Sequence, residues 1–130
     1  MRAILYGIPT AALAMVIAAK TVRAEVEIGQ TFTTQAVCKS AALVEAQVRA
    51  VVDTGGKYDK ANALYERDMQ NGDCVSLPYA ATVKVVEAGY VSPVIVDSDG
   101  DTIRMNVVRI EAPAPVWTVA FEIIKAAGKS

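Results

Sequence analysis

The hydrophobic pattern of this 130-residue chain changes at Cys74, and that change limits the folds open to it. From residue 38 to residue 70, apolar residues recur three or four positions apart, as they do along one face of a helix. A Gly-Gly pair at 55–56 divides the stretch, which predicts helices over 38–53 and 57–70 that form an αα-hairpin. After Cys74 the chain is rich in Val, Ile and Thr and is interrupted by Pro and Gly, as short strands are.

The second half of the chain predicts a small antiparallel β-structure. We expect five strands, at 74–77, 81–88, 91–97, 102–110 and 116–124. The alternation slips by one residue within residues 84–87 and again at Val107 and Val108, which indicates two β-bulges. Such strands can close into a barrel whose layout resembles the SH3 type, or form an open sheet with the helices on one face. Both outcomes belong to the α+β class.

The N-terminus has the layout of a secretory signal peptide. Residues 3–19 carry no charge and follow Arg2, and small residues precede a cleavage site after Ala24, so the predicted signal covers residues 1–24. Cleavage after Ala19 is a second possibility. Retention of the same apolar run as a membrane anchor is the alternative, since 17 residues approach the length that spans a bilayer. Cleavage predicts a periplasmic or secreted protein.

The rest of the chain is long enough for one domain. Residues 25–37 are expected to form a flexible leader or an edge strand. Residues 38–130 are expected to form a single α+β domain, with the helical hairpin over 38–73 and the β-structure over 74–124. All 14 acidic residues but only 10 of the 13 basic ones lie beyond residue 24, so the net charge there is −4. An acidic excess does not favour nucleic acid or an anionic membrane surface as a partner.

Two cysteines, Cys38 and Cys74, stand 36 positions apart. Export to an oxidising compartment predicts that they form a disulfide, which would tie the start of the first helix to the exit of the second. In the chain-entropy model this bond stabilises the fold by roughly 3–4 kcal/mol. The spacing is not that of a CxxC redox motif, and without histidine the two thiols cannot complete a zinc site unless carboxylates join them. Two buried free thiols are the alternative if the chain is not exported.

Catalytic and cofactor motifs are missing from the sequence. The chain contains no histidine, no G-x-S-x-G, no P-loop and no dinucleotide-binding fingerprint, so we expect no cofactor and no enzymatic activity. Paired carboxylates can catalyse glycoside hydrolysis, which leaves a small carboxylate-dependent hydrolase using Asp53, Asp68 or Asp73 as an alternative. Charged residues in helices more often face water, and we expect that of these three.

Residues 97–101, DSDGD, predict a hairpin turn between two strands. The turn also places Asp97, Asp99 and Asp101 at alternate positions, which makes them a weak candidate for a cation site. A calcium loop of the EF-hand type needs its glycine and its distal Glu at other positions, so the plain turn is the preferred interpretation.

Three aromatic residues, Tyr79, Tyr90 and Trp117, are candidate binding anchors because they stand at predicted turns or strand junctions. Packing in or beside the core is the alternative for each of them. The sequence therefore predicts an exported, non-catalytic module that binds or regulates an envelope protein or a cell-wall component. A membrane-anchored subunit of an envelope complex is the second hypothesis.

Overall fold

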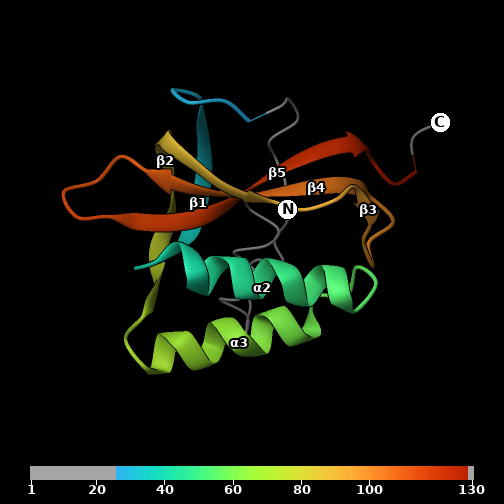
Figure 1. Cartoon of the computed structure of the whole chain (residues 1–130), viewed down its shortest axis with the longest axis horizontal. Helices are drawn as coiled ribbons and strands as arrows, with labels where there is room; N and C mark the ends of the chain where they lie inside the picture. The colour runs from blue at the N-terminus through green and yellow to red at the C-terminus, as the bar shows by residue number, and fades with distance from the viewer. Residues whose placement is uncertain (1–25, 129–130) are drawn as a thin grey trace.

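The computed structural model describes residues 26–128, in which two helices pack on one side of a curved five-stranded antiparallel sheet (Figure 1). The elements, in chain order, are β1 (Thr31–Cys38), α2 (Ala41–Asp53), α3 (Asp59–Gln70), β2 (Cys74–Val91), β3 (Ile95–Val96), β4 (Thr102–Ile110) and β5 (Val116–Lys125). The predicted α+β class and the helical hairpin are confirmed. The predicted signal peptide lies outside the described residues.

The strand pairings form a ring. The sheet order is β2-β1-β5-β4-β3, and β2 pairs in addition with β4. The long strand β2 makes this possible, because its residues up to Lys84 pair with β1 and those from Val85 onward pair with β4. Between β1 and β5 the described register contains one pair, Cys38 with Trp117. The described strands thus close into a small barrel, and β3 extends one end of β4.

Two expectations about the strands are wrong. Residues 31–38 are neither a flexible leader nor an edge strand, because β1 lies between β2 and β5. The predicted strands at 74–77 and 81–88 are one strand, and the predicted strand at 91–97 is reduced to Ile95–Val96. Residues 77–80 of β2 bulge out of the ladder with β1 and have no register partner there. The strand can therefore continue past Pro78, because the N–H that a proline lacks is not needed at this position.

The two predicted β-bulges have different outcomes. The register between β2 and β4 shifts between Val85 and Glu87, so the predicted bulge within residues 84–87 is confirmed. The predicted irregularity at Val107 and Val108 is absent from the hairpin of β4 and β5, whose register runs without a shift from Ile103 to Ile110. It is present in the ladder with β2, where the register shifts opposite Val107, between Ala88 and Val91. Two consecutive valines of a regular strand are buried because each face of β4 meets a hydrophobic core.

These two cores share no residue. The first core lies between the helices and the outer face of the barrel, and Val107 belongs to it. The second core fills the interior of the ring, since all four ring strands contribute to it: its members are Phe32, Val85, Val108, Ile110 and Ala120. No helical residue belongs to the second core, so the barrel has an apolar interior of its own.

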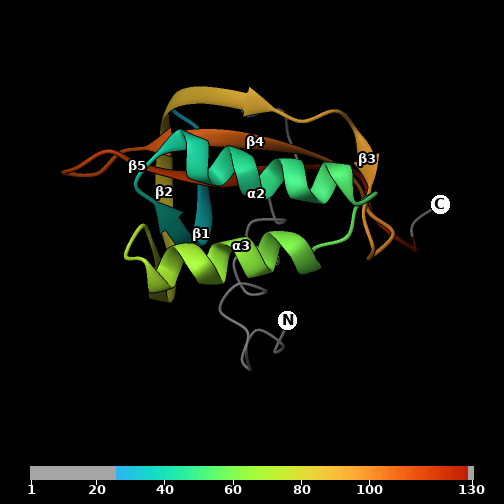
Figure 2. The ribbon, with the colours of Figure 1, turned by 60° about the horizontal axis from the view of Figure 1, so that its bottom comes forward.

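The helical hairpin is inserted between β1 and β2. Helix α2 begins at Ala41 rather than at the predicted residue 38, because the chain is still in β1 at Cys38 and Ser40 caps the helix by accepting from Leu43 N at 3.4 Å. The turn between the helices lies beside β3 (Figure 2). Gly56 permits this contact: its φ is +95°, and a Cβ there would come within 2.3 Å of the Val96 carbonyl oxygen.

Within residues 26–128, no helix is both long enough and apolar enough to span a membrane.

Candidate functional site

The disulfide between Cys38 and Cys74 is present, as predicted. The two cysteines are register partners on β1 and β2, with their Cα atoms 3.9 Å apart, so the bond joins the strands that flank the hairpin rather than the helices themselves. Next to it, Lys39 N donates to the Asp73 carbonyl at 2.9 Å, and Lys39 Nζ lies 2.7 Å from Asp73 Oδ1. Covalent, hydrogen-bonded and ionic contacts therefore all close the base of the hairpin.

A buried polar group beside the disulfide was not expected from the sequence. Gln47 of α2 donates from Nε2 to Asp68 Oδ2 at 3.2 Å, and the same nitrogen lies 3.7 Å from each disulfide sulfur. Arg67 also donates to Asp68, at 3.0 Å. Asp68 is 2% exposed, so its expected place on a water-facing surface is wrong. Its spacing from Ala61 and Tyr65, which share the buried face of α3, is the signal that could have shown this.

The other two carboxylates considered for hydrolysis are placed differently. Asp53 is the exposed last residue of α2, at the turn end of the hairpin, whereas Asp68 and Asp73 are at its base. Asp68 and Asp73 each have a basic partner, Arg67 and Lys39. The fold thus separates Asp53 from the other two and gives both of those a neutralising contact.

The acidic turn connects β3 to β4, and Asp97 organises it. Its Oδ1 accepts from the backbone N–H groups of Asp99 and Asp101 at 2.9 and 3.0 Å. Ligand oxygens of the three aspartates lie within 4.8 Å of one another, close enough to share a cation. Asp101 Oδ1 also accepts from Ala127 N at 2.7 Å. These internal contacts account for the shape of the turn.

Tyr58 links this turn to the helical hairpin. Its hydroxyl donates to Asp97 Oδ2, and Ser98 N donates to the Gly56 carbonyl at 2.9 Å. Burial raises the pKa of Tyr58 far above its usual value, and the hydrogen bond to Asp97 acts in the same direction. We call the Tyr58–Asp97 contact the clasp. It fastens the turn end of the hairpin, while the disulfide closes the base.

The three candidate aromatic anchors do not form one surface. Tyr79 is 79% exposed in the bulge at residues 77–80, where β2 runs beside β1. Tyr90 lies near the far end of β2, in the part that pairs with β4, and both Tyr90 and Trp117 are half-buried against the first core. The candidate anchors are therefore one isolated exposed residue, Tyr79, and one pair, Tyr90 and Trp117.

Tyr90 and Trp117 each have an arginine beside them. The guanidinium carbon of Arg49 lies 4.1 Å from the centroid of the Tyr90 ring. Gly89, which precedes Tyr90, lies against Trp117, since a Cβ at that glycine would be 3.3 Å from Cζ3 of the indole. Arg109 is in turn the register partner of Trp117. We call Arg49, Tyr90, Trp117 and Arg109 the aromatic–arginine patch.

Each arginine of the patch has an acidic partner. Arg49 Nε lies 2.7 Å from Glu45 Oε2 one helical turn away, and Arg109 Nε lies 2.7 Å from Glu87 Oε1 across the strands. The hydrogen bond to Glu45 raises the pKa of Arg49. The patch therefore combines aromatic area with balanced charge, and each of its arginines is oriented by its ion pair.

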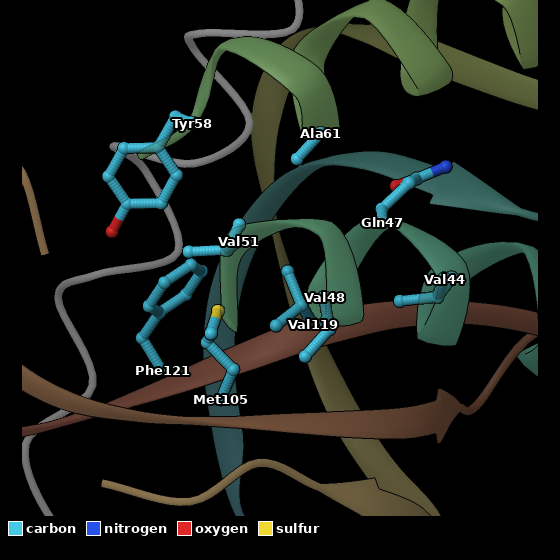
Figure 3. Close-up of a pocket in the computed structure, with 9 residues that line it drawn as sticks. All are labelled: Val44, Gln47, Val48, Val51, Tyr58, Ala61, Met105, Val119 and Phe121. Carbon is cyan, nitrogen blue, oxygen red and sulfur yellow. The ribbon is translucent and has the colours of Figure 1, made fainter. Parts of the chain in front are cut away.

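A small cavity lies between α2, α3 and the sheet (Figure 3). Its volume is about 20 Å³, far below the roughly 300–1,000 Å³ of small-molecule sites. The lining side chains are Val44, Gln47, Val48, Val51, Tyr58, Ala61, Met105, Val119 and Phe121. The amide of Gln47 points away from the space (Figure 3). We interpret the cavity as a packing gap in the first core.

The fold and these contacts define a small barrel that carries a disulfide-closed helical hairpin. No family model matches the sequence, and comparisons with curated proteins and with solved structures give no significant match.

Proposed function

We propose that this chain is an exported, non-catalytic module of the cell envelope that binds a protein partner through the aromatic–arginine patch. The observation that carries the proposal is the grouping of these four residues: Arg49 lies over the Tyr90 ring, Gly89 beside Tyr90 lies against Trp117, and Arg109 is the register partner of Trp117. Tyr, Trp and Arg are the residue types that contribute most binding energy at protein interfaces.

The local structure supports this use of the patch. Trp117 and Arg109 are register partners on paired strands, and Arg49 is held by both Glu45 and the Tyr90 ring. Side chains held in this way lose little conformational entropy when a partner binds. Tyr90 lies where the register of β2 with β4 shifts, between Ala88 and Val91. The charge balance of the two arginine–glutamate pairs favours a partner surface of mixed, near-neutral character over a strongly acidic one.

The disulfide supports the exported location. Disulfides persist in the periplasm and outside the cell and are rare in the cytosol. The charge-free N-terminal run supports the same location, because it has the composition of a signal peptide. N-terminal sequencing of the protein recovered from the envelope fraction tests this part: a first residue at Glu25 agrees with it, and an intact Met1 supports the membrane-anchored alternative.

The binding proposal is tested with matched surface variants. Oxidised wild-type protein, Arg49→Ala, Arg109→Ala and Tyr79→Ala are immobilised and exposed to envelope extract, and retained proteins are identified by mass spectrometry. We expect one protein to be retained by wild type and by Tyr79→Ala and to be lost with both arginine variants. Thermal unfolding checks that all variants are folded. Retention that is equal for all four forms, or retention of glycan fragments instead of a protein, contradicts the proposal.

A further inference from the structure

The two ends of the helical hairpin are fastened by different means, and the disulfide lies beneath it. Cys38 and Cys74 are 2% and 3% exposed, and both belong to the first core, which the helices cover. Gln47 of α2 lies within 3.7 Å of each sulfur. In the described structure, the helical hairpin therefore shields the S–S bond from reagents in solution.

We infer that the helical hairpin is a lid over the Cys38–Cys74 disulfide, held shut at its turn by the clasp, and that thiols reach the bond only when this lid opens. The inference stands apart from the proposed binding function. It concerns which part of the molecule must move, and it predicts that the barrel stays folded while the lid is open.

Separate cores make such an opening possible. The lid packs through the first core, whereas the second core contains residues of the barrel strands alone. Lifting the helices would leave Phe32, Val85 and Val108 packed inside the ring. A segment that packs independently in this way can open as a unit, at a free energy below that of global unfolding.

The strands keep the disulfide in place while the lid is open. Ala36 pairs with Ser76 and Val37 pairs with Val75, immediately before the cysteine pair. Residues 38 and 74 therefore stay adjacent in any state that retains the β1–β2 ladder. Neither opening nor closing of the lid requires the S–S bond to break.

The chemistry of the test is thiol–disulfide exchange with dithiothreitol. One thiolate of the reagent attacks a cysteine sulfur, the S–S bond breaks, and the departing thiolate takes up a proton. The second thiol of the reagent then attacks the mixed disulfide and releases the other cysteine as a thiol. The reagent leaves as its cyclic disulfide, so the protein gains two electrons and two protons. Alkylation followed by mass spectrometry gives the rate.

Loosening the clasp should accelerate this reaction. When closing is faster than exchange, the observed rate is the exchange rate of an exposed disulfide multiplied by the equilibrium constant of lid opening. Tyr58→Phe removes a hydrogen bond to a carboxylate at the turn. We expect the full-length variant to be reduced roughly tenfold faster or more than wild type. Tyr79→Phe, a change at an exposed tyrosine, should leave the rate unchanged.

A variant in the second core separates lid opening from global unfolding. Val108→Ala weakens the barrel interior, which remains intact when the lid opens, so its reduction rate should stay within about twofold of wild type while its denaturant midpoint falls. Ile110→Val is the milder form of the same control if the first variant does not fold. Acceleration by either variant in proportion to its lost global stability overturns the inference, as does an unchanged rate in Tyr58→Phe.

Discussion

Cys38 and Trp117 form the one described register pair through which β1 meets β5, and the barrel closes at this pair. Beside it, the Thr118 hydroxyl donates to the Ala36 carbonyl at 2.7 Å and lies 3.0 Å from the Thr34 hydroxyl. Both threonines are buried. Side-chain hydrogen bonds thus supplement a seam that has little backbone pairing.

Replacement of Thr118 by Val should therefore weaken the whole fold. The change keeps the shape of the side chain but leaves buried oxygens at the seam with fewer partners, which costs about 1–3 kcal/mol. Urea denaturation followed by Trp117 fluorescence measures the effect. Thr82→Val, at an exposed position of β2, is the control and should change the free energy of unfolding by less than about 0.5 kcal/mol. Equal effects of the two variants would show that the seam hydroxyls contribute nothing.

Removal of the disulfide should lower global stability more than it shifts the lid equilibrium. The double variant Cys38→Ala and Cys74→Ala loses roughly 3–4 kcal/mol in the chain-entropy model, because its unfolded chain gains freedom. With the barrel folded, the β1–β2 ladder already holds these positions together. Hydrogen exchange should therefore accelerate strongly in the strands that exchange by global unfolding. Helical amides that exchange through lid opening should accelerate less than these strand amides, because the change removes from beneath the lid only the two sulfurs beside Gln47.

Removal of the hydroxyl should change the free energy of unfolding differently at two buried tyrosines. Tyr58 donates to Asp97, so Tyr58→Phe should cost about 1.5–3 kcal/mol. The Tyr65 hydroxyl is buried and meets the Ser76 side chain without a hydrogen bond of standard geometry, so Tyr65→Phe should be neutral or stabilising by up to about 1 kcal/mol. Thermal unfolding of the two variants provides the comparison. A loss in Tyr65→Phe as large as that in Tyr58→Phe would contradict the assignment.

Stability should decline at strongly alkaline pH. Burial raises the pKa of Tyr65 from 10.0 to about 12, and the interaction with the Ser76 side chain opposes this rise. Burial also raises the pKa of Tyr58. A group whose pKa is higher in the folded state stabilises fully below its unfolded pKa and loses that contribution as the pH rises. Because the ionised Tyr65 side chain is disfavoured by burial in the folded state, stability should fall as the pH rises from 10.0 to about 12. Denaturant midpoints measured across this range should fall less steeply in Tyr65→Phe.

Replacement of the buried Asp68 should lower the free energy of unfolding more than replacement of an exposed aspartate. Asp68→Asn places an amide where Gln47 and Arg67 both donate, which creates a donor facing a donor and costs about 1–3 kcal/mol. Asp53→Asn, at the exposed end of α2, should lie within about 0.5 kcal/mol of wild type. Chemical denaturation of both variants tests the difference. Equal stability of the two would argue against a structural role for the contacts of Asp68.

Local pattern was sufficient to predict several elements. The three- and four-residue spacing around Val44, Val48 and Val51 predicted α2, and the same rule predicted α3. The cysteine pairing followed from the count of two and from the antiparallel hairpin between them. The slip within residues 84–87 predicted a bulge that is present. Each of these inferences depends on neighbours along the chain, which the sequence shows directly.

Other features depended on which distant segments meet. Closure of the ring buried Val108 and placed β1 between β2 and β5, because local periodicity does not show which strands become neighbours. Packing of the helices on the outer face of the ring buried Val107. Packing of the hairpin on the barrel buried Asp68 and brought Tyr58 to Asp97. Pairing of β2 with β4 brought Gly89, the neighbour of Tyr90, against the indole of Trp117. The sequence by itself determined the helices, the strand-forming regions and the disulfide, since these follow from spacing and side-chain chemistry. The tertiary structure decided the ring, the two cores and the aromatic–arginine patch, since these arise from contacts between residues far apart in the chain.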